Sequence, residues 1–214
     1  MKNNISISRA TIDRLPLYFR TLRSIQAEGT EIISSDELGN RLAVTPEQIR
    51  KDLASFGQFG KKGVGYYVRE LTKNIGEILG LHYNWNVAVV GLGHLGGALA
   101  NYPNFISLGF NLTAIFDTDP GKIGKTVNNI VISGLSTLGT VVAERNIHIG
   151  IITVPENQAQ QVADLLVEAG IRGIWNFAPL KLQVPAEVCL VEEDLSVGLS
   201  SLSYYLARKQ LKNL

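Results

Sequence analysis

The stretch Asn86–Ala100, "NVAVVGLGHLGGALA", decides the fold of the larger part of this chain. An apolar run typical of a buried strand leads into the pattern Gly-x-Gly-x-x-Gly at Gly91, Gly93 and Gly96, and a helical pattern follows. The first glycine permits a tight turn, the second lets a pyrophosphate approach the backbone, and the third lets the helix pack close to its strand. The sequence therefore predicts a dinucleotide-binding turn, with the anion at the N-terminus of a helix.

A carboxylate at the end of the next predicted strand supports the same function. Asp117 ends "FNLTAIFD", 21 positions after Gly96, where it can accept hydrogen bonds from the adenosine ribose hydroxyls. A 2′-phosphate would meet its negative charge, and no arginine adjoins it, so the pattern favours NAD(H) over NADP(H). A purely structural glycine turn and a turn that binds coenzyme A are the alternatives, and Asp117 argues against the second.

The rest of the second half alternates apolar strands with amphipathic helices, which predicts a doubly wound parallel sheet of the Rossmann type. An enzyme built on it would need a general acid or base beside the nicotinamide. The histidines are His82, His94 and His148, and none is expected at the carboxyl end of a strand, where ligands bind in such sheets. No substrate domain is expected after the sheet. We therefore expect a protein that is not an enzyme.

The first 80 residues carry a different pattern. A first helix is predicted over 10–29, with Pro16 near its start and Gly29 at its end. A second helix has Ser34 or Ser35 as its N-cap, and a third has Thr45 as N-cap with Pro46 at its first position. The residues expected to face outward on the third helix are Gln48, Arg50, Lys51 and Ser55.

A hairpin signal follows the third helix in "QFGKKGVGYYVREL", where two extended pieces flank a turn that contains Lys61 and Lys62. Three helices followed by a basic hairpin predict a winged helix-turn-helix. The third helix of such a domain fits the major groove of DNA, and the hairpin reaches the backbone or the minor groove. A small helical module with solvated charges is the alternative.

Composition agrees with two soluble domains. The chain has 214 residues, 45% of them hydrophobic and 18% charged, which excludes a disordered protein. Residues 1–80 hold twelve Lys and Arg against nine Asp and Glu, net +3, and the remainder holds eight against ten, net −2. Cys189 is the only cysteine, which excludes an intrachain disulfide and a cysteine-cluster metal site, and its flanks "VCLV" predict a buried strand. Without a signal peptide or a membrane-length apolar run, a cytoplasmic protein is expected.

The segments "VTPEQIRKDLASFGQFGKKGVGYYV" and "VAVVGLGHLGGALA…FD" together resemble the Rex family of redox-sensing transcriptional repressors, and the resemblance extends from about Ile12 to the C-terminal helix. It implies a homodimer that binds an inverted-repeat operator on double-stranded DNA when the NADH/NAD+ ratio is low, and that leaves the DNA when NADH binds. The alternative from another class is an NAD-dependent oxidoreductase whose basic N-terminal module binds something else.

The resemblance also implies roles for particular residues. Lys62 stands at the wing tip, where the family usually has an arginine, and the two cations are not interchangeable. The residues expected to contact DNA are Arg14, Ser35, Thr45, Gln48, Arg50, Lys51, Lys61 and Lys62. Those expected to line the NAD(H) site are Gly91, Gly93, His94, Leu95, Gly96, Tyr102, Phe105, Asp117, Thr153, Val154, Pro155, Asn176 and Phe177.

A switch is implied by the same resemblance. Arg20 would pair with Asp194 of the partner subunit, and Tyr102 would compete for that aspartate in the NADH-bound form. Leu195 stands where the family often has an aromatic residue beside the partner's nicotinamide. The alternatives are an ordinary half-buried Tyr102, a helix cap at Asp194 and a solvated charge at Arg20.

The expected domains are therefore a winged helix over 1–80, an NAD(H)-binding domain over 81–195 and a dimerisation helix over 196–214. The last is amphipathic and, in the family, reaches across to the other subunit.

Overall fold

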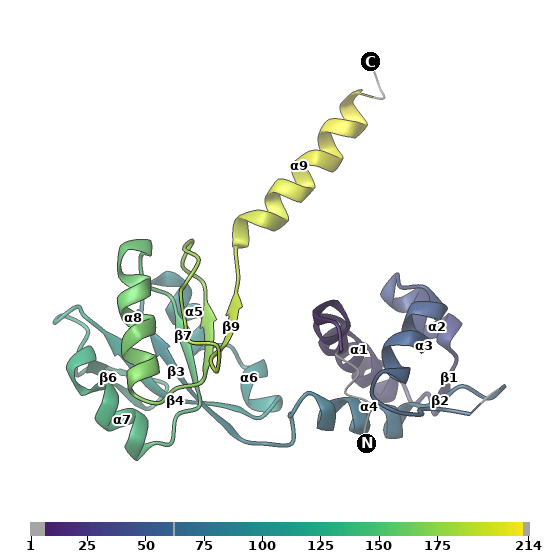
Figure 1. Ribbon diagram of the computed structural model, residues 1–214, viewed down its shortest axis with the longest axis horizontal. Coiled ribbons are helices and arrows are strands. Elements are labelled where there is room, and N and C mark those ends of the chain that lie inside the picture. The colour runs from purple at the N-terminus through teal and green to yellow at the C-terminus, as the bar shows by residue number, and fades with distance from the viewer. Residues whose placement is uncertain (1–6, 62, 212–214) are drawn as a thin grey trace. The chain divides into compact units, whose positions relative to one another are not determined.

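The computed structural model describes residues 7–61 and 63–211, and the chain divides into two compact units, the first ending at Tyr83 and the second beginning at Asn84 (Figure 1). The first unit is helical and carries one two-stranded ladder. The second is an α/β unit around a seven-stranded sheet. The predicted fold class, a winged-helix unit followed by a doubly wound sheet, is confirmed.

The first unit contains four helices and two short strands within its described residues. In chain order these are α1 (Arg9–Ala27), β1 (Ile32–Ile33), α2 (Ser35–Leu42), α3 (Pro46–Ala54), β2 (Tyr66–Tyr67) and α4 (Val68–Ile78). Apolar residues spaced three and four apart on the helices meet in one core, whose fully buried members include Leu15, Leu22, Leu38, Ile49 and Ile75.

Local capping explains where α2 and α3 begin. Ser34 caps α2 in a reciprocal capping box with Glu37, which settles the choice between the two serines. Thr45 accepts a hydrogen bond from the backbone N–H of Gln48, and Pro46 occupies the first turn of α3, as predicted. Between them Ala43 adopts a left-handed conformation at φ +52°, which ends α2 and makes the turn tight.

The predicted position of Pro16 in the first helix is wrong. Pro16 lies in the interior of α1 and not near its start, because Ser8 caps the helix upstream of the first apolar residue used to place it. The loss of an N–H donor at Pro16 is tolerated because Pro16 and Ile12, whose carbonyl it would have served, are both exposed.

The wing also differs from a simple hairpin. Lys61 and Gly65 close the turn by a single bridge, and Tyr66–Tyr67 pair instead with Ile32–Ile33, which precede α2. Gly65 has φ +106° and lies against the carbonyl of Ile33, a contact that a side chain would block. Lys62 lies outside the described residues.

The sheet of the second unit has the strand order β5-β6-β4-β3-β7-β8-β9, parallel except for the β5–β6 pair. The strands are β3 (Trp85–Val90), β4 (Phe110–Asp117), β5 (Thr126–Val127), β6 (Ile130–Gly134), β7 (Ile149–Ile152), β8 (Gly173–Asn176) and β9 (Cys189–Glu192). From β3 the chain first adds β4, β5 and β6 on one side, and then crosses over to add β7, β8 and β9 on the other side, so the order of the strands reverses at β3. That reversal opens a crevice at the carboxyl ends of β3, β4 and β7.

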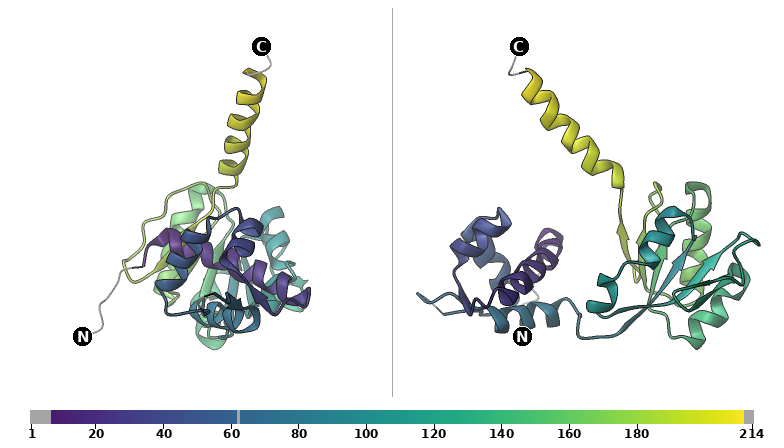
Figure 2. Two further views of the ribbon diagram at one scale, coloured as in Figure 1. Left: turned by 90° about the vertical axis from the view of Figure 1, so that its right-hand side faces the viewer. Right: turned by 180° about the vertical axis from the view of Figure 1, so that it is seen from behind.

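Helices cover both faces of this sheet (Figure 2). On one face Ala88 and Val90 meet α7 (Leu138–Glu144) and α8 (Glu156–Glu168). On the other face Val87 and Val89 meet Leu99 and Phe105, which come from α5 (His94–Ala100) and α6 (Asn104–Ser107). The alternation of neighbouring residues of β3 between the two clusters explains why this strand is apolar throughout.

The last strand and helix are exposed. Cys189 was predicted to lie in a buried strand, and this is wrong, because β9 is the edge strand of the sheet and the cysteine is exposed. In α9 (Leu195–Leu211) each residue from Leu195 to Arg208 is exposed, including Leu199, Leu202 and Tyr205. None of the helices in the described part of the chain combines the length and the apolar character needed to cross a membrane.

Candidate functional site

The glycine turn that joins β3 to α5 is closely packed. Gly91 has φ +94°, and its N–H donates to the carbonyl of Phe116 at 2.8 Å. The hydroxyl of Thr153, at the end of β7, donates to the Gly91 carbonyl at 2.6 Å. Gly96 is buried against this turn, and a β-carbon there would overlap the Gly91 carbonyl oxygen and lie 2.7 Å from the Thr153 hydroxyl oxygen. Only glycine allows α5 to approach so closely.

A cavity of about 510 Å³ opens beside this turn at the carboxyl ends of the parallel strands. It brings together residues from four strand ends that were expected to hold a dinucleotide: Gly91, Gly93, Leu95, Asp117, Thr153, Val154, Pro155 and Phe177. It is also lined by residues not predicted from the sequence, among them Lys122 and Gln158. The N-terminus of α5 begins at this cavity, so its backbone N–H groups and positive dipole end favour an anion there.

Asp117 lines the cavity and is only 7% exposed. One carboxylate oxygen accepts from the N–H of Leu92 at 2.7 Å and from Lys122 Nζ at 3.0 Å, and the other accepts from the N–H of Asp119 at 2.8 Å. Burial alone would raise the pKa of Asp117, but these hydrogen bonds outweigh it and hold the pKa below its ordinary value. Asp117 is therefore ionised at neutral pH and braces the glycine turn through Leu92.

Lys122 changes the electrostatics that the sequence suggested. No arginine adjoins Asp117, as expected, yet a lysine five positions later in the loop folds back onto the carboxylate. The pair is partly shielded, since the Lys122 side chain is about a third exposed and that of Asp117 is nearly buried. A cation thus compensates the charge that was expected to exclude a 2′-phosphate.

Other predicted cofactor residues do not line this cavity. His94 is exposed at the first position of α5. Asn176 is fully buried, where its side-chain amide donates to the carbonyls of Ala178 and Leu180 and accepts from the N–H of Ala178. Asn176 therefore shapes the loop that carries Phe177 and acts on the cavity indirectly.

Tyr102 and Phe105 belong to an aromatic cluster that extends to the cavity wall. The ring of Phe105 packs on Tyr102 at 5.0 Å and on Trp175 at 6.2 Å, and Trp175 packs on Phe177 at 4.5 Å between centroids. Trp175 was not predicted as a site residue. Its indole Nε1 is buried without a hydrogen-bond partner among the described residues.

In the first unit, three of the residues predicted to contact DNA line a second hollow. It has a volume of about 690 Å³ and lies between the start of α2, α3 and the wing turn, with Ser35, Arg50 and Lys61 in its lining. Arg50 Nη1 donates to the Ser35 hydroxyl at 2.8 Å, and Arg50, Lys51 and Lys61 are all exposed. A basic surface with a neighbouring helix N-terminus suits a phosphate backbone.

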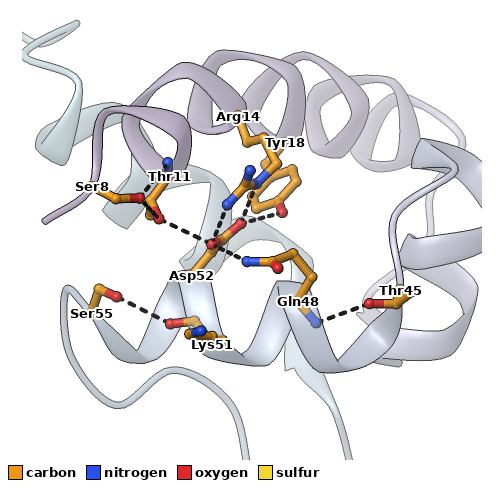
Figure 3. Close-up of polar contacts among 9 residues, drawn as sticks. All are labelled: Ser8, Thr11, Arg14, Tyr18, Thr45, Gln48, Lys51, Asp52 and Ser55. Carbon is orange, nitrogen blue, oxygen red and sulfur yellow. Dashed lines mark hydrogen bonds and ion pairs between the residues drawn. The ribbon is translucent and has the colours of Figure 1, made fainter.

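Two predicted DNA contacts face a buried carboxylate instead (Figure 3). Arg14 donates two hydrogen bonds to Asp52, from Nε at 2.6 Å and from Nη2 at 2.7 Å. Gln48 was expected to face outward, and this is wrong for its amide, which is partly buried and donates to Asp52 at 2.8 Å. Thr45 uses its hydroxyl to cap α3. Asp52 could not be predicted as a site residue, because all of its partners except Gln48 lie on α1 and not on its own helix.

The residues implied to form the switch each have separate surroundings in the structure. Asp194 accepts from the N–H and the hydroxyl of Ser196 at 2.8 and 2.6 Å, so it caps α9, one of the alternatives considered. These two hydrogen bonds lower the pKa of Asp194. Arg20 is exposed on α1, and Tyr102 and Leu195 are 47% and 62% exposed. Arg20 and Asp194 belong to different units, and their pairing stays a prediction.

Two family models match successive parts of the chain. Residues 6–54 match the model described as putative DNA-binding protein N-terminus, and residues 82–180 match the model described as CoA binding domain. Two curated relatives are each called redox-sensing transcriptional repressor Rex. The one from Chloroflexus aurantiacus is 50% identical over 93% of this chain and 94% of its own length. The one from Syntrophobacter fumaroxidans is 51% identical over 94% and 96%.

Two solved structures are similar to this chain over nearly its whole length. RSP in complex with β-NAD+ and operator DNA is 42% identical, with a TM-score of 0.91 over 97% of this chain and 95% of that one. RSP in complex with β-NADH is 40% identical, with a TM-score of 0.90 over 98% and 99%. A winged helix joined to a dinucleotide-type sheet defines a transcription regulator that responds to a small molecule. The chain belongs to the Rex family of redox-sensing transcriptional repressors, whose members are named as regulators and not as enzymes.

Proposed function

We propose that this protein is a homodimeric repressor that binds an inverted-repeat operator and is released from it by NADH. The observation that carries the proposal is the cavity of the second unit, where the glycine turn and Asp117 meet at the carboxyl ends of the strands. The relative RSP supports it, having been solved with β-NAD+ and operator DNA and with β-NADH.

The DNA-binding part of the proposal rests on the first unit. Arg50 and Lys51 on α3 would enter the major groove, and Lys61 at the wing turn would meet the backbone, as Lys62 would at the wing tip. Ser35 and Thr45, at the starts of α2 and α3, would contact phosphates. A dimer would place two such units on half-sites about one helical turn or a multiple apart.

The exposed face of α9 supports the dimer. A helix whose leucines and tyrosines are exposed from Leu195 to Leu206 needs a partner to bury them, and a second copy of the same helix end supplies one of matching character. In this proposal Leu195 of the partner subunit covers the nicotinamide together with Phe105.

The redox response follows from the charge of the nicotinamide ring. NAD+ carries a positive charge there and NADH does not, so an apolar surround favours the reduced form, because burying an unpaired charge costs several kcal/mol. NADH would stabilise a dimer in which Asp194 leaves Arg20 for Tyr102 and the winged units lose their operator spacing. To shift the populations of the two dimer states from 1:99 to 99:1, NADH must bind one state more tightly than the other by about 5.5 kcal/mol.

The direct test is fluorescence anisotropy of a labelled duplex titrated with the protein at fixed salt, since phosphate contacts make the affinity steeply salt-dependent. The duplex is an inverted repeat selected by this protein from a randomised pool. We expect binding that micromolar NADH reverses and equimolar NAD+ does not reverse. Equal responses to the two nucleotides, or none to either, would refute redox-dependent repression.

The proposed switch predicts a separable effect at Asp194. Asp194→Asn keeps a side chain able to cap α9, yet it removes the negative charge that Arg20 would pair with. We expect NADH affinity within about threefold of the parent and a clear weakening of NADH-driven release of the duplex. Asp194→Ala, which also removes the cap, separates the two roles. Normal release in the Asn variant would rule out the Arg20–Asp194 pair.

Asp117 should matter for affinity. Asp117→Ala removes the acceptor for the ribose hydroxyls and the brace on Leu92, and we expect NADH to bind about ten- to a hundredfold more weakly. NADH fluorescence titration measures the change. Asp164→Asn, on the exposed surface of α8, is the control and should bind NADH as the parent does. An unchanged affinity in Asp117→Ala would place the adenosine ribose elsewhere.

A further inference from the structure

A buried carboxylate links the helix proposed to enter the major groove to the first helix of the same unit. Asp52 on α3 is 1% exposed and accepts five hydrogen bonds (Figure 3). One oxygen accepts from Arg14 Nε at 2.6 Å and the Tyr18 hydroxyl at 2.7 Å. The other accepts from Arg14 Nη2 at 2.7 Å, Gln48 Nε2 at 2.8 Å and the Thr11 hydroxyl at 3.2 Å. The carboxylate thus has as many donors as its roughly four lone-pair sites can use.

The donors come from one face of α1. Thr11, Arg14 and Tyr18 are spaced three and four residues apart, so their side chains project toward the same side of the helix. The Ser8 hydroxyl extends the group by hydrogen bonding to Thr11 at 2.9 Å. Because hydrogen bonds are directional, these bonds fix the position of Asp52 and the orientation of its carboxylate. The apolar contacts of Ile49 and Leu53 nearby are non-directional.

The rotation of α3 about its axis decides where its exposed cations point. Lys51 and Arg50 precede Asp52 by one and two residues, which places them about 100° and about 200° around the helix from it. A carboxylate held on the inner face therefore aims both cations outward. Since base contacts depend on placement to a fraction of an ångström, a small roll of α3 would cost specific contacts before it cost backbone attraction.

We propose, resting on the operator binding proposed above, that Arg14 acts as a positioning residue which sets the register of α3 through Asp52, and that it is not a phosphate contact. Two of its three guanidinium nitrogens are used in the two-pronged bond to Asp52, and its side chain is 28% exposed. Burial by itself would raise the pKa of Asp52, but the bonds from Arg14, Tyr18 and Gln48 bring it down to about 2, so the pair is ionised throughout the physiological range.

The test compares Arg14→Gln, Asp52→Asn and the double variant on two duplexes, the selected inverted repeat and a scrambled duplex of equal composition, over a range of salt. We expect each single variant to bind the selected duplex about ten- to a hundredfold more weakly, the range of one lost base contact. Binding to the scrambled duplex and the slope of log affinity against log salt should stay as in the parent. The double variant should be no weaker than the weaker single one, because both act on one element.

Lys61→Ala is the comparison for a true phosphate contact. It should weaken both duplexes and reduce the magnitude of the salt slope by about one. Arg14→Lys adds a second criterion, since a lysine replaces a point charge at a phosphate but not a two-pronged bond to a carboxylate. A slope reduced by about one in Arg14→Gln, or full operator binding in Arg14→Lys, would overturn the proposal.

Three further measurements separate an effect on folding from an effect on function. Tyr18→Phe removes one donor and keeps the ion pair, and we expect a smaller loss on the selected duplex with none on the scrambled one; an equal loss on both would also overturn the proposal. Hydrogen exchange of α1 and α4 reports whether the first unit is folded, and NADH affinity should be unchanged in all variants. If the parent itself selects no duplex, the proposed function fails. If NADH releases the parent protein from the duplex but the salt slopes of the Arg14 variants differ from those expected, only the proposed role of Arg14 fails.

Discussion

Gly96→Ala is expected to lower the affinity for NADH by at least about a hundredfold. The added β-carbon would overlap the carbonyl oxygen of Gly91 and lie 2.7 Å from the Thr153 hydroxyl oxygen, and both are held by hydrogen bonds to neighbouring strands. The start of α5 must therefore move away from the turn, and a shift of about 1 Å at a preorganised site costs about two orders of magnitude. NADH fluorescence titration or calorimetry measures the loss.

Gly97→Ala is the matched control for this variant. Gly97 is the next residue of the same helix, and a β-carbon there meets no atom within 4 Å, so its NADH affinity should stay near that of the parent. The Gly96→Ala protein should still bind the operator but should no longer be released by NADH. NADH affinity within tenfold of the parent would show that the close approach of α5 is dispensable for binding.

Asp52→Ala is expected to destabilise the first unit by about 3–5 kcal/mol. It leaves the Arg14 guanidinium without its counter-ion and the fully buried hydroxyl of Tyr18 without its acceptor, and breaking a buried pair from one side is among the most costly substitutions. Hydrogen exchange of the α1 amides in the full chain measures the opening free energy. Arg41→Ala, which breaks an exposed pair with Glu28, is the control and should change it far less.

The same carboxylate predicts a dependence on pH. The pKa of Asp52 is about 2 in the folded protein, against an ordinary value of 3.8. A depressed folded-state pKa means that the stabilisation, roughly 2 kcal/mol, is fully present above about pH 4 and is lost as the pH falls toward 2. Asp52→Asn should lack this part of the acid profile. Parallel acid unfolding curves for the two proteins would contradict the assignment of the low pKa to Asp52.

The features that could be predicted from the sequence are those that a short stretch of residues determines. The glycine turn at Gly91–Gly96 and the carboxylate of Asp117 follow from a strand–turn–helix pattern and a fixed spacing, and both meet in the cavity. The caps at Ser34 and Thr45 follow likewise, because a cap and the N–H it accepts from are three residues apart.

What could not be predicted depends on contacts between distant or irregular segments. The Arg14–Asp52 pair joins residues 38 positions apart, and no helical period reveals it. Lys122 reaches Asp117 only through the shape of an irregular loop. The exposure of Cys189 depends on the order of the strands, since an apolar run predicts a strand but not whether that strand lies at the edge.

The two-residue ladder between β1 and β2 shows a further limit. Strands of this length have no periodicity to detect, and the pairing is fixed by the left-handed glycine at Gly65 together with the segment before α2. A hairpin was the natural prediction for residues 58–67 because both halves adjoin a glycine turn. In the structure Tyr66–Tyr67 pair instead with Ile32–Ile33, and α2 and α3 separate the two strands in the sequence.

The hydroxyl of Thr153 has a consequence for how a signal could leave the cavity. Because it ties the carbonyl of Gly91 to the end of β7, while the N–H of Gly91 is tied to β4, the glycine turn is held in one defined conformation. An element with a single state cannot report which of two ligands is bound. The turn can therefore serve as a fixed anchor common to the oxidised and reduced dinucleotides, and we expect the discrimination between them to come from residues beyond the turn, such as the aromatic cluster of Tyr102, Phe105 and Trp175 that extends to the cavity wall.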